Sequence, residues 1–322
     1  MRSLRLSGGN QTATKSTLEK EAKAFDKQVD ERIKHGFVPD LRRLRKVYWF
    51  YNNLWREPEF VKIQMIPKID FVLEIAKKRG GKVLEIGCGY GYLSLELARN
   101  GLDVLGVDLS SKSIEIARRF AKKNPFKKNF GFLTYKSGDV LSMDLGKNEY
   151  DSAVFFGSLH HMPDINMVLS KVHAGLKSGG NLIVCEPVSD NFTTQSAEFA
   201  AVLRAVLPTW IPYEKKLKNL DNPKAWKRYV NNIFNEYTYR SEHKQSPCDN
   251  ITSSEKLMIN AIKKKFQIKT IVYSDAFIDK LIGGLRGKHR YQLARFLKSL
   301  DEDLIRRKVL PPTFIRVHAV KK

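Results

Sequence analysis

Three glycines at alternate positions, Gly87, Gly89 and Gly91, are the residues whose spacing points most directly to chemistry. A short apolar run precedes them, and a helical pattern that begins at Leu93 comes after them. A strand, a tight turn and a helix start in this order form a nucleotide site at the carboxyl end of a sheet strand. Glycine allows the backbone to approach a ligand there. The segment therefore predicts a site for a nucleotide-like ligand.

The spacing of these glycines narrows the choice of ligand. The dinucleotide fingerprint has glycine at the first, third and sixth positions, but here the sixth position is Tyr92 and the third glycine comes one residue earlier, at Gly91. No Lys-Ser or Lys-Thr pair comes next, so the loop is not a phosphate-binding P-loop. Glu85 adds a negative charge before the loop. That charge favours a cationic or hydroxyl-bearing ligand over a pyrophosphate.

Acidic residues also end the next two predicted strands. Asp108 ends an apolar run about 20 residues beyond the glycine loop, where an acid can bind the two hydroxyls of a ribose. Ser110 or Ser111 is then a candidate to cap a helix. Asp139 occupies the third strand-end position. Each acid alone is also consistent with a turn or a helix cap, and it is their shared place at strand ends that predicts one binding site.

With these landmarks in order, the sequence resembles the class I S-adenosylmethionine-dependent methyltransferases, whose first motif reads acid-x-Gly-x-Gly-x-Gly. The run from Tyr150 to Asp164 closely matches the signature found after the family's fourth strand. The resemblance implies S-adenosylmethionine as the cofactor. The residues that it implies for cofactor binding are Glu85, Gly87, Cys88, Gly89, Gly91, Asp108, Leu109, Asp139, Val140, Phe156 and Gly157.

The resemblance also assigns roles to several of these residues. Asp108 would bind the ribose hydroxyls, and Leu109 would pack on the adenine. Asp139 and Val140 would meet the polar edge and the face of the adenine, and Phe156 would line the sulfonium end. The glycine loop would pass beneath the methionine and the ribose.

Two adjacent histidines, His160 and His161, come after the fourth predicted strand and are the candidate catalytic residues. A hydroxyl acceptor needs a proton acceptor, which histidine can provide near neutral pH. Two interpretations are open: one histidine is the base, or both brace the loop by hydrogen bonding. Glu186 and His243 are further base candidates. A metal site from the histidine pair and Asp164 is disfavoured because adjacent histidines in such a turn usually diverge, and no metal is predicted.

The residues just after the fourth strand suggest the acceptor class. Family members that methylate amino groups of nucleic acids carry Asp/Asn-Pro-Pro-aromatic there, whereas this chain has Gly157-Ser158-Leu159-His160. The Leu-His-His-x-Pro-Asp run resembles the branch that acts on small molecules, quinones, sterols or sugars. We therefore expect O- or N-methylation of a small-molecule or lipid-linked acceptor by in-line displacement. An RNA methyltransferase and a non-catalytic adaptor with the same fold are the alternatives.

The composition fits a globular protein with anionic partners. The 322 residues carry a formal net charge of +23 at pH 7, which favours a phosphorylated substrate, an anionic membrane surface or, with less support, RNA; a solvated basic surface is the alternative. No run approaches the ~18–20 apolar residues that span a bilayer. The start lacks the apolar segment of a secretion signal, and three scattered cysteines form no disulfide framework. These features predict a cytoplasmic protein, with attachment to a membrane surface left open.

The order of apolar patterns predicts an α/β fold with a parallel sheet and with helical N-terminal and inserted lid segments. The resemblance implies that the sheet is Rossmann-like, seven-stranded and mostly parallel, with helices on both faces. The predicted parts are a disordered basic arm (1–15), an N-terminal helical cap (16–79), the methyltransferase core (80–188 and 251–322) and a helical lid over the site (189–250). A helix is predicted within 41–55, where Tyr48 or Tyr51 is a candidate to contact the cofactor; ordinary packing in the core is the alternative. Thr252 with Glu255 is predicted as a capping box.

Overall fold

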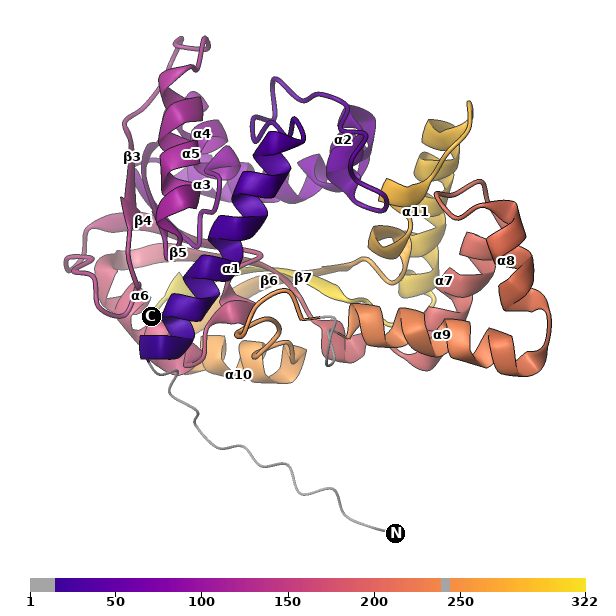
Figure 1. Ribbon diagram of the computed structural model, residues 1–322. Coiled ribbons are helices and arrows are strands. Elements are labelled where there is room, and N and C mark those ends of the chain that lie inside the picture. The colour runs from indigo at the N-terminus through magenta and orange to yellow at the C-terminus, as the bar shows by residue number, and fades with distance from the viewer. Residues whose placement is uncertain (1–14, 239–243) are drawn as a thin grey trace.

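The computed structural model describes residues 15–238 and 244–322, and a seven-stranded sheet forms its centre (Figure 1). The predicted arm, apart from Lys15, lies outside the described residues. The strands are β1 (Lys82–Ile86), β2 (Asp103–Asp108), β3 (Leu133–Ser137), β4 (Tyr150–Phe156), β5 (Leu176–Pro187), β6 (Phe266–Ser274) and β7 (Phe314–Lys321). Their order across the sheet is β3-β2-β1-β4-β5-β7-β6. Only the pairs that include β7 are antiparallel, so the predicted sheet is confirmed.

This strand order places the site. The chain moves outward from β1 to β3 and then returns to the other side of β1 with β4. Open α/β sheets bind ligands at this reversal, at the carboxyl ends of the strands. The register pairs Glu85 with Gly106 of β2 and with Val154 of β4. The glycine loop, Asp108 and the turn after β4 therefore start from one edge of the sheet.

Helices cover both faces of the sheet and extend beyond it. They are α1 (Lys15–Lys34), α2 (Pro58–Gln64), α3 (Ile66–Arg79), α4 (Tyr92–Arg99), α5 (Ser111–Lys122), α6 (Ile165–Gly175), α7 (Thr194–Val206), α8 (Tyr213–Leu220), α9 (Pro223–Tyr237), α10 (Glu255–Lys265) and α11 (Arg290–Arg306). Short 3₁₀ turns lie at Leu54–Arg56, Leu159–His161, Ser189–Asn191, Ile278–Lys280 and Ile282–Gly284. None of the helices within the described ranges has both the length and the apolarity needed to cross a bilayer.

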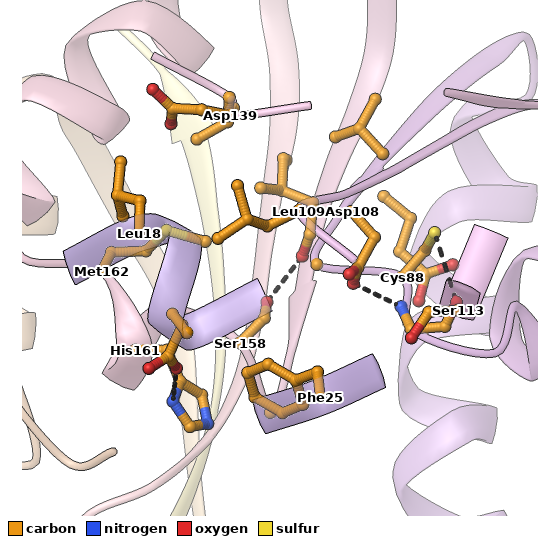
Figure 2. Close-up of a pocket in the computed structure, with 18 of the residues that line it drawn as sticks. Leu18, Phe25, Cys88, Asp108, Leu109, Ser113, Asp139, Ser158, His161 and Met162 are labelled. Atoms are coloured by element: carbon orange, nitrogen blue, oxygen red, sulfur yellow. Dashed lines mark hydrogen bonds and ion pairs between the residues drawn. The ribbon is translucent and has the colours of Figure 1, made fainter. Parts of the chain in front are cut away.

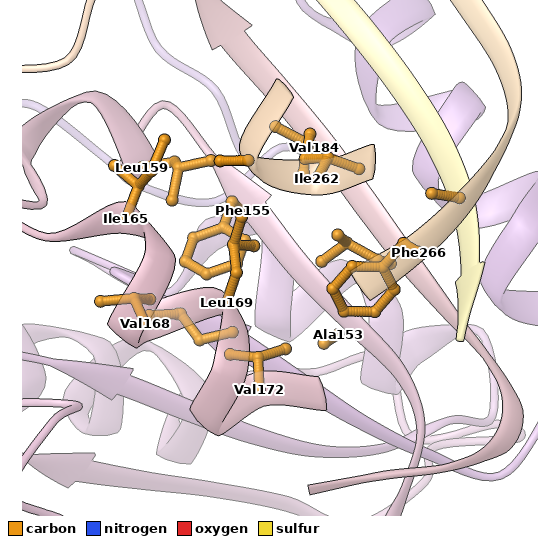
Figure 3. Packing of buried hydrophobic residues seen from close by; sticks show 14 of the residues in the cluster. Ala153, Phe155, Leu159, Ile165, Val168, Leu169, Val172, Val184, Ile262 and Phe266 are labelled. Atoms are coloured by element: carbon orange, nitrogen blue, oxygen red, sulfur yellow. The ribbon is translucent and has the colours of Figure 1, made fainter. Parts of the chain in front are cut away.

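The sheet is buried on both faces, which explains its nearly continuous apolar strands. On one face, α3 and α4 pack against side chains such as Val83 and Ile183. On the other face, α6 and α10 enclose Phe155 and Val184 (Figure 3). Neighbouring residues of β4 thus face opposite cores, and the strand ends are held rigidly where the site begins.

Two local predictions are wrong. Residues 41–53 form turns and loops instead of a helix. Consecutive aromatic and β-branched residues are poor helix formers, and here Val47 and Phe50 are buried beneath the loop while the buried Arg56 donates to the carbonyl oxygens of Tyr48 and Phe50. Helix α10 is capped by Ser254, not by Thr252, and begins two residues later than the predicted capping box requires.

The segment predicted as a lid is helical but lies away from the glycine loop. Figure 1 shows α7, α8 and α9 together near α11, at the end of the molecule opposite β3 and α6. Phe199 and Leu203 of α7 pack on the cluster formed by Phe277 and Leu297. These helices therefore extend the core beyond β6 and β7.

Candidate functional site

A cavity of about 420 Å³ lies at the carboxyl ends of β1, β2 and β4, within the size range of small-ligand sites. Its lining comes from the glycine loop, the turns after β2, β3 and β4, and helix α1. Every predicted cofactor residue except Gly91 lines it. Figure 2 shows Asp108 and Leu109 near its middle, Asp139 at one side and Phe25 and His161 at another.

Two glycines of the loop, Gly87 and Gly89, line the cavity, and Gly91 does not. Gly87, Gly89 and Gly91 all have positive φ angles, of 71°, 51° and 75°. A Cβ on Gly89 would meet no atom within 4 Å and would project into open space, whereas one on Gly91 would lie 2.4 Å from the hydroxyl oxygen of Tyr135. Gly91 therefore permits close packing of the start of α4 against β3, and the structure does not place it at the ligand surface.

Asp108 joins the loop to the end of β2. Its Oδ2 accepts the Gly89 amide hydrogen at 2.7 Å, and its Oδ1 accepts that of Ser110 at 2.8 Å. Burial raises the pKa of this carboxyl, against the effect of these hydrogen bonds. Each carboxylate oxygen has a further lone pair. The side chain can therefore fix the loop and still accept hydroxyl hydrogens from a ligand in the cavity.

Glu85 behaves differently from the charged residue that its sequence position suggests. Its side chain is buried at the end of β1, and Ser94 Oγ donates a hydrogen bond to its Oε2. Burial, reinforced by the charge of Asp108, raises the pKa of Glu85 to about 8. The group is thus mostly protonated at pH 7, so it can donate a hydrogen bond into the cavity instead of supplying a negative charge.

The turns after β3 and β4 complete the floor. Asp139 accepts the amide hydrogen of Leu141 at 3.0 Å and the hydroxyl hydrogen of Ser142 at 2.8 Å, which closes the turn beside Val140. On the other side, the Gly157 amide donates to the Cys185 carbonyl oxygen at 2.8 Å. The first turn is therefore held by its own hydrogen bonds and the second by a bond to β5, and residues of both turns line the cavity.

The two histidines have different surroundings. His160 is buried, and its Nδ1 lies 2.7 Å from Oε2 of Glu186, whose Oε1 also accepts the Ser158 and Leu159 amides at 2.8 Å. Burial and the neighbouring His161 lower the pKa of His160. His161 lines the cavity, with its ring edge against Phe25 at 5.3 Å between centroids. His160 is therefore placed as a brace, and His161 faces the ligand.

Helix α1, which belongs to the segment predicted as the N-terminal cap, lines one side of the cavity. Glu21 on α1 accepts hydrogen bonds from Ser246 Oγ and from the Cys248 amide, both at 2.7 Å. Neither interpretation of Tyr48 and Tyr51 agrees with the structure: these side chains are 73% and 71% exposed, so they do not pack in the core, and they do not line the cavity.

The predicted lid contributes little to this cover. No residue of α7, α8 or α9 lines the cavity, and Gln245 is the single lining residue among the described part of 189–250. His243 lies outside the described residues. A covering role for the whole segment stays a prediction.

The residues present fit an adenosyl sulfonium. Even without the protonated Glu85, carboxyl groups outnumber basic side chains in the lining, which contains Glu21, Asp108, Asp139 and Asp164 against Arg32 and His161. Such a lining favours a cationic ligand and repels a pyrophosphate. The open space over Gly89 accepts a ligand that a Cβ would obstruct, and Asp108 has free lone pairs for ribose hydroxyls.

Comparison with known proteins agrees with this geometry. Residues 77–238 match the family model described as a methyltransferase domain. The sterol 24-C-methyltransferase of Saccharomyces cerevisiae is 26% identical over 207 residues, which cover 59% of this chain and 53% of that protein. The ubiquinone biosynthesis O-methyltransferase of Pelagibacter ubique is 33% identical over 131 residues, covering 41% and 51%. The chain spans about half the length of these curated relatives.

Solved structures show the same fold at lower identity. The geranyl diphosphate C-methyltransferase of Streptomyces coelicolor has a TM-score of 0.53 and 15% identity, with 97% of this chain and 100% of that chain covered. The [4+2]-cyclase SpnF has a TM-score of 0.54 and 14% identity, with 95% and 96% covered. The family model covers half of the chain, and with the glycine loop and strand-end acids in place the chain belongs to the class I S-adenosylmethionine-dependent methyltransferases, with S-adenosylmethionine as its cofactor.

Proposed function

We propose that the protein methylates a small-molecule or lipid-linked acceptor that enters beside the turn after β4. The main observation in support is that the cavity extends from the glycine loop to an apolar end. Leu18 and Phe25 of α1 and Met162 and Met167 after β4 form that end. An apolar end next to a cofactor site suits a ring or a hydrocarbon chain. The cofactor supplies a methyl group that is already activated on a sulfonium.

The contribution of the protein is then mainly alignment. Holding two reacting groups in line at near-attack distance can lower a barrier by ~7–11 kcal/mol. Helix α1 closes the cavity and keeps water from the reacting atoms, which also strengthens the local electrostatics. We assign His161 to contact with the acceptor, because it lines the cavity. His160 is a positioning residue, because it is hydrogen-bonded to Glu186 beneath the turn.

The charge around the cavity argues against the RNA alternative. Glu21, Asp139 and Asp164 line the cavity, and their carboxylates would repel the phosphates of a nucleic acid that approached the methyl group. The excess of basic residues therefore acts elsewhere on the surface. A phosphorylated acceptor would bind with its phosphate outside the cavity.

Helix α8 supports the lipid-linked form of the proposal. Tyr213, Leu217 and Leu220 recur at helical spacing and are 67%, 49% and 50% exposed. Lys215 and Lys218 are exposed on the same helix. An exposed apolar face flanked by lysines suits the surface of an anionic membrane. We infer that α8, which lies at the far end of the molecule from the cavity, rests on such a surface and holds the protein near lipid-linked acceptors.

A vesicle sedimentation assay tests this membrane contact. Leu217→Glu should lower binding to vesicles of anionic phospholipid about tenfold or more, because burying a leucine is worth ~1.5–3 kcal/mol. Leu257→Glu is the matched control, since Leu257 is 59% exposed but lies on α10. Wild-type protein that stays in the supernatant with anionic vesicles would rule out the membrane contact.

The activity itself is tested by incubating the protein with methyl-labelled S-adenosylmethionine and separate fractions of cell lipids, small metabolites and RNA. We expect label in the lipid or metabolite fraction. Label in RNA alone would replace the proposal with the RNA alternative. A fold shared with a [4+2]-cyclase shows that the fold does not fix the reaction, so binding of S-adenosylhomocysteine without any transfer would favour a non-catalytic role.

A further inference from the structure

A cluster of possible metal ligands lies at the edge of the cavity. One ligand atom each from His160, His161 and Asp249 lie within 4.8 Å of one another. The histidine rings do not diverge as expected from their adjacency: their centroids are 4.1 Å apart with planes tilted by 43°. Asp164 does not take part in this cluster, because its carboxylate caps α6 by accepting the Met167 amide at 2.9 Å.

We propose that His160, His161 and Asp249 bind a divalent transition-metal ion at this end of the cavity. Two imidazoles and one carboxylate form a donor set that suits Zn²⁺, Fe²⁺ or Mn²⁺, whereas Mg²⁺ and Ca²⁺ prefer oxygen donors alone. No metal site is predicted from the sequence. The third ligand proposed here, Asp249, lies in a segment almost 90 residues further along the chain than the histidines, so the sequence spacing does not indicate it. That segment is fixed against the histidines, since the Thr252 amide donates to the His160 carbonyl oxygen at 3.1 Å.

The surroundings of His160 resemble those of a metal-bound histidine. Its Nδ1 is engaged by Glu186 at 2.7 Å, so Nε2 is the nitrogen that remains for a ligand. Metal-binding histidines usually donate their other N–H to a carboxylate, which fixes the ring and raises its basicity. Glu186 is itself fixed by the amides of Ser158 and Leu159. The supporting layer of the proposed site is therefore already assembled.

His161 is held beside the cluster by an acidic partner. Its Nδ1 is buried and lies 3.2 Å from Oε1 of Glu21. This pairing fixes the ring next to His160. A cation placed between the histidines and Asp249 would also lie close to the Glu21 carboxylate.

The spacing is close to that of a coordination shell. Bonds of 2.0–2.2 Å in a tetrahedral site separate neighbouring ligand atoms by about 3.4 Å. The 4.8 Å limit of the cluster therefore requires a closure of up to about 1.4 Å. Oδ2 of Asp249 accepts the Gln245 amide at 2.8 Å and Oδ1 accepts the Asn250 side chain at 3.0 Å, so a carboxylate rotation can provide this closure while the loop keeps one of its contacts.

The role of the ion rests on the proposed function. His161 lines the cavity, so a position of the metal opposite the protein ligands would face the acceptor. An acceptor hydroxyl bound there would lose its proton to water more easily, because a metal lowers the pKa of a bound oxygen. A lone pair of that oxygen then forms the bond to the methyl carbon while the carbon–sulfur bond breaks and its electron pair returns to sulfur. The products are the methylated acceptor, S-adenosylhomocysteine and one proton.

Metal binding can be measured without any activity assay. Untagged full-length protein is stripped with a chelator, dialysed, and titrated with Zn²⁺, Mn²⁺ and Mg²⁺, with the bound metal counted by mass spectrometry. We expect one Zn²⁺ or Mn²⁺ per chain and at least tenfold weaker binding of Mg²⁺. Replacement by Co²⁺ should give the visible absorption of an ion with nitrogen ligands. A wild-type chain that retains no metal and shows no Co²⁺ spectrum overturns the proposal.

Variants locate the site. Asp249→Asn keeps the side-chain shape and should weaken Zn²⁺ binding at least tenfold, while Asp164→Asn, a neighbouring acid that can still cap α6, should leave it unchanged. Equal weakening by both variants, or by neither, contradicts the assignment. Affinity for S-adenosylhomocysteine reports the fold of each variant, because the glycine loop is outside the cluster.

The two proposals fail separately. Metal binding without methyl transfer to any fraction would contradict the proposed function and would still support the metal site. Unchanged methyl transfer by the metal-free protein, with no measurable metal binding, would contradict the metal site and would still support the proposed function.

Discussion

Replacement of Asp108 by asparagine is the sharpest test of the cofactor site. In the wild-type chain both carboxylate oxygens already accept backbone amides, from Gly89 and Ser110, and their remaining lone pairs face the cavity. Asparagine has nearly the same shape, but one of its two ends donates hydrogen bonds. Asp108→Asn therefore removes the acceptor from one ribose hydroxyl, weakens the contact with the other, and leaves one loop amide without its partner.

The size of the effect depends on these contacts. A hydrogen bond to a charged group is worth about 1.5–3 kcal/mol, so two ribose hydroxyls account for about 3–6 kcal/mol of binding. Asparagine loses one of these bonds and weakens the other, and 1.4 kcal/mol is a factor of ten, so the Kd for S-adenosylhomocysteine should rise at least about tenfold and at most about 10⁴-fold. The unpaired loop amide should lower the free energy of unfolding by about 1–3 kcal/mol. Titration calorimetry measures the first quantity and denaturant unfolding the second.

A matched control lies on the same strand. Asp103 begins β2 and accepts the Phe132 amide at 2.8 Å, but at the opposite end of the strand from the cavity. Asp103→Asn should therefore leave the Kd unchanged. If folded Asp108→Asn protein bound S-adenosylhomocysteine within threefold of the wild-type affinity, Asp108 would not be a ribose ligand and the cofactor would lie in a different orientation.

Two further predictions concern the loop and a buried ion pair. Gly89→Ala and Gly101→Ala both place alanine at a positive φ, 51° and 83°, and each should cost about 1–2 kcal/mol of unfolding free energy. Calorimetry should show at least tenfold weaker S-adenosylhomocysteine binding for Gly89→Ala alone, and equal affinities would contradict the loop assignment. Burial alone would raise the pKa of Asp275, but Lys68 and a second lysine outweigh it and lower the pKa to about 2. Because the folded-state pKa is depressed, the stability that this carboxylate provides is present above about pH 3.8 and is lost as the pH falls towards 2, a change of about 2 kcal/mol. In denaturant unfolding, Asp275→Asn should lack this pH dependence. The variant should also lose about 3–5 kcal/mol of unfolding free energy at pH 7.

The parts of the fold that the sequence predicts are those with a local cause. Glycines at positive φ, apolar runs of strand length, and acids at strand ends each reflect the geometry of a few neighbouring residues, so the glycine loop, Asp108 and Asp139 can be placed from the sequence. Ser110 is a predicted helix cap, and it accepts the Ser113 amide at 2.9 Å. Parallel strands then bring these local features to one edge without further information.

The parts that the sequence does not predict depend on contacts between distant segments. The cover of the cavity requires Glu21 to meet the Cys248 amide, 227 residues away, and no local pattern encodes that pairing. The loop at 41–53 likewise exists because Arg56 and a buried aromatic cluster hold it. Apolar periodicity indicates that a residue is buried, but it does not indicate which surface buries it.

The charge of the chain illustrates the same limit and has a functional consequence. A net charge of +23 suggests anionic partners, yet acidic residues outnumber basic ones among the residues that line the cavity. Electrostatic interactions between exposed charges are largely screened beyond about 10 Å at moderate salt, so the local carboxylates decide which ligand enters the cavity and the basic exterior decides which surface the protein approaches. The two preferences are compatible if the acceptor has an apolar or cationic reactive end and is presented at an anionic surface. That combination is met by an acceptor held in an anionic membrane more readily than by a nucleic acid, whose phosphates accompany every base into the site.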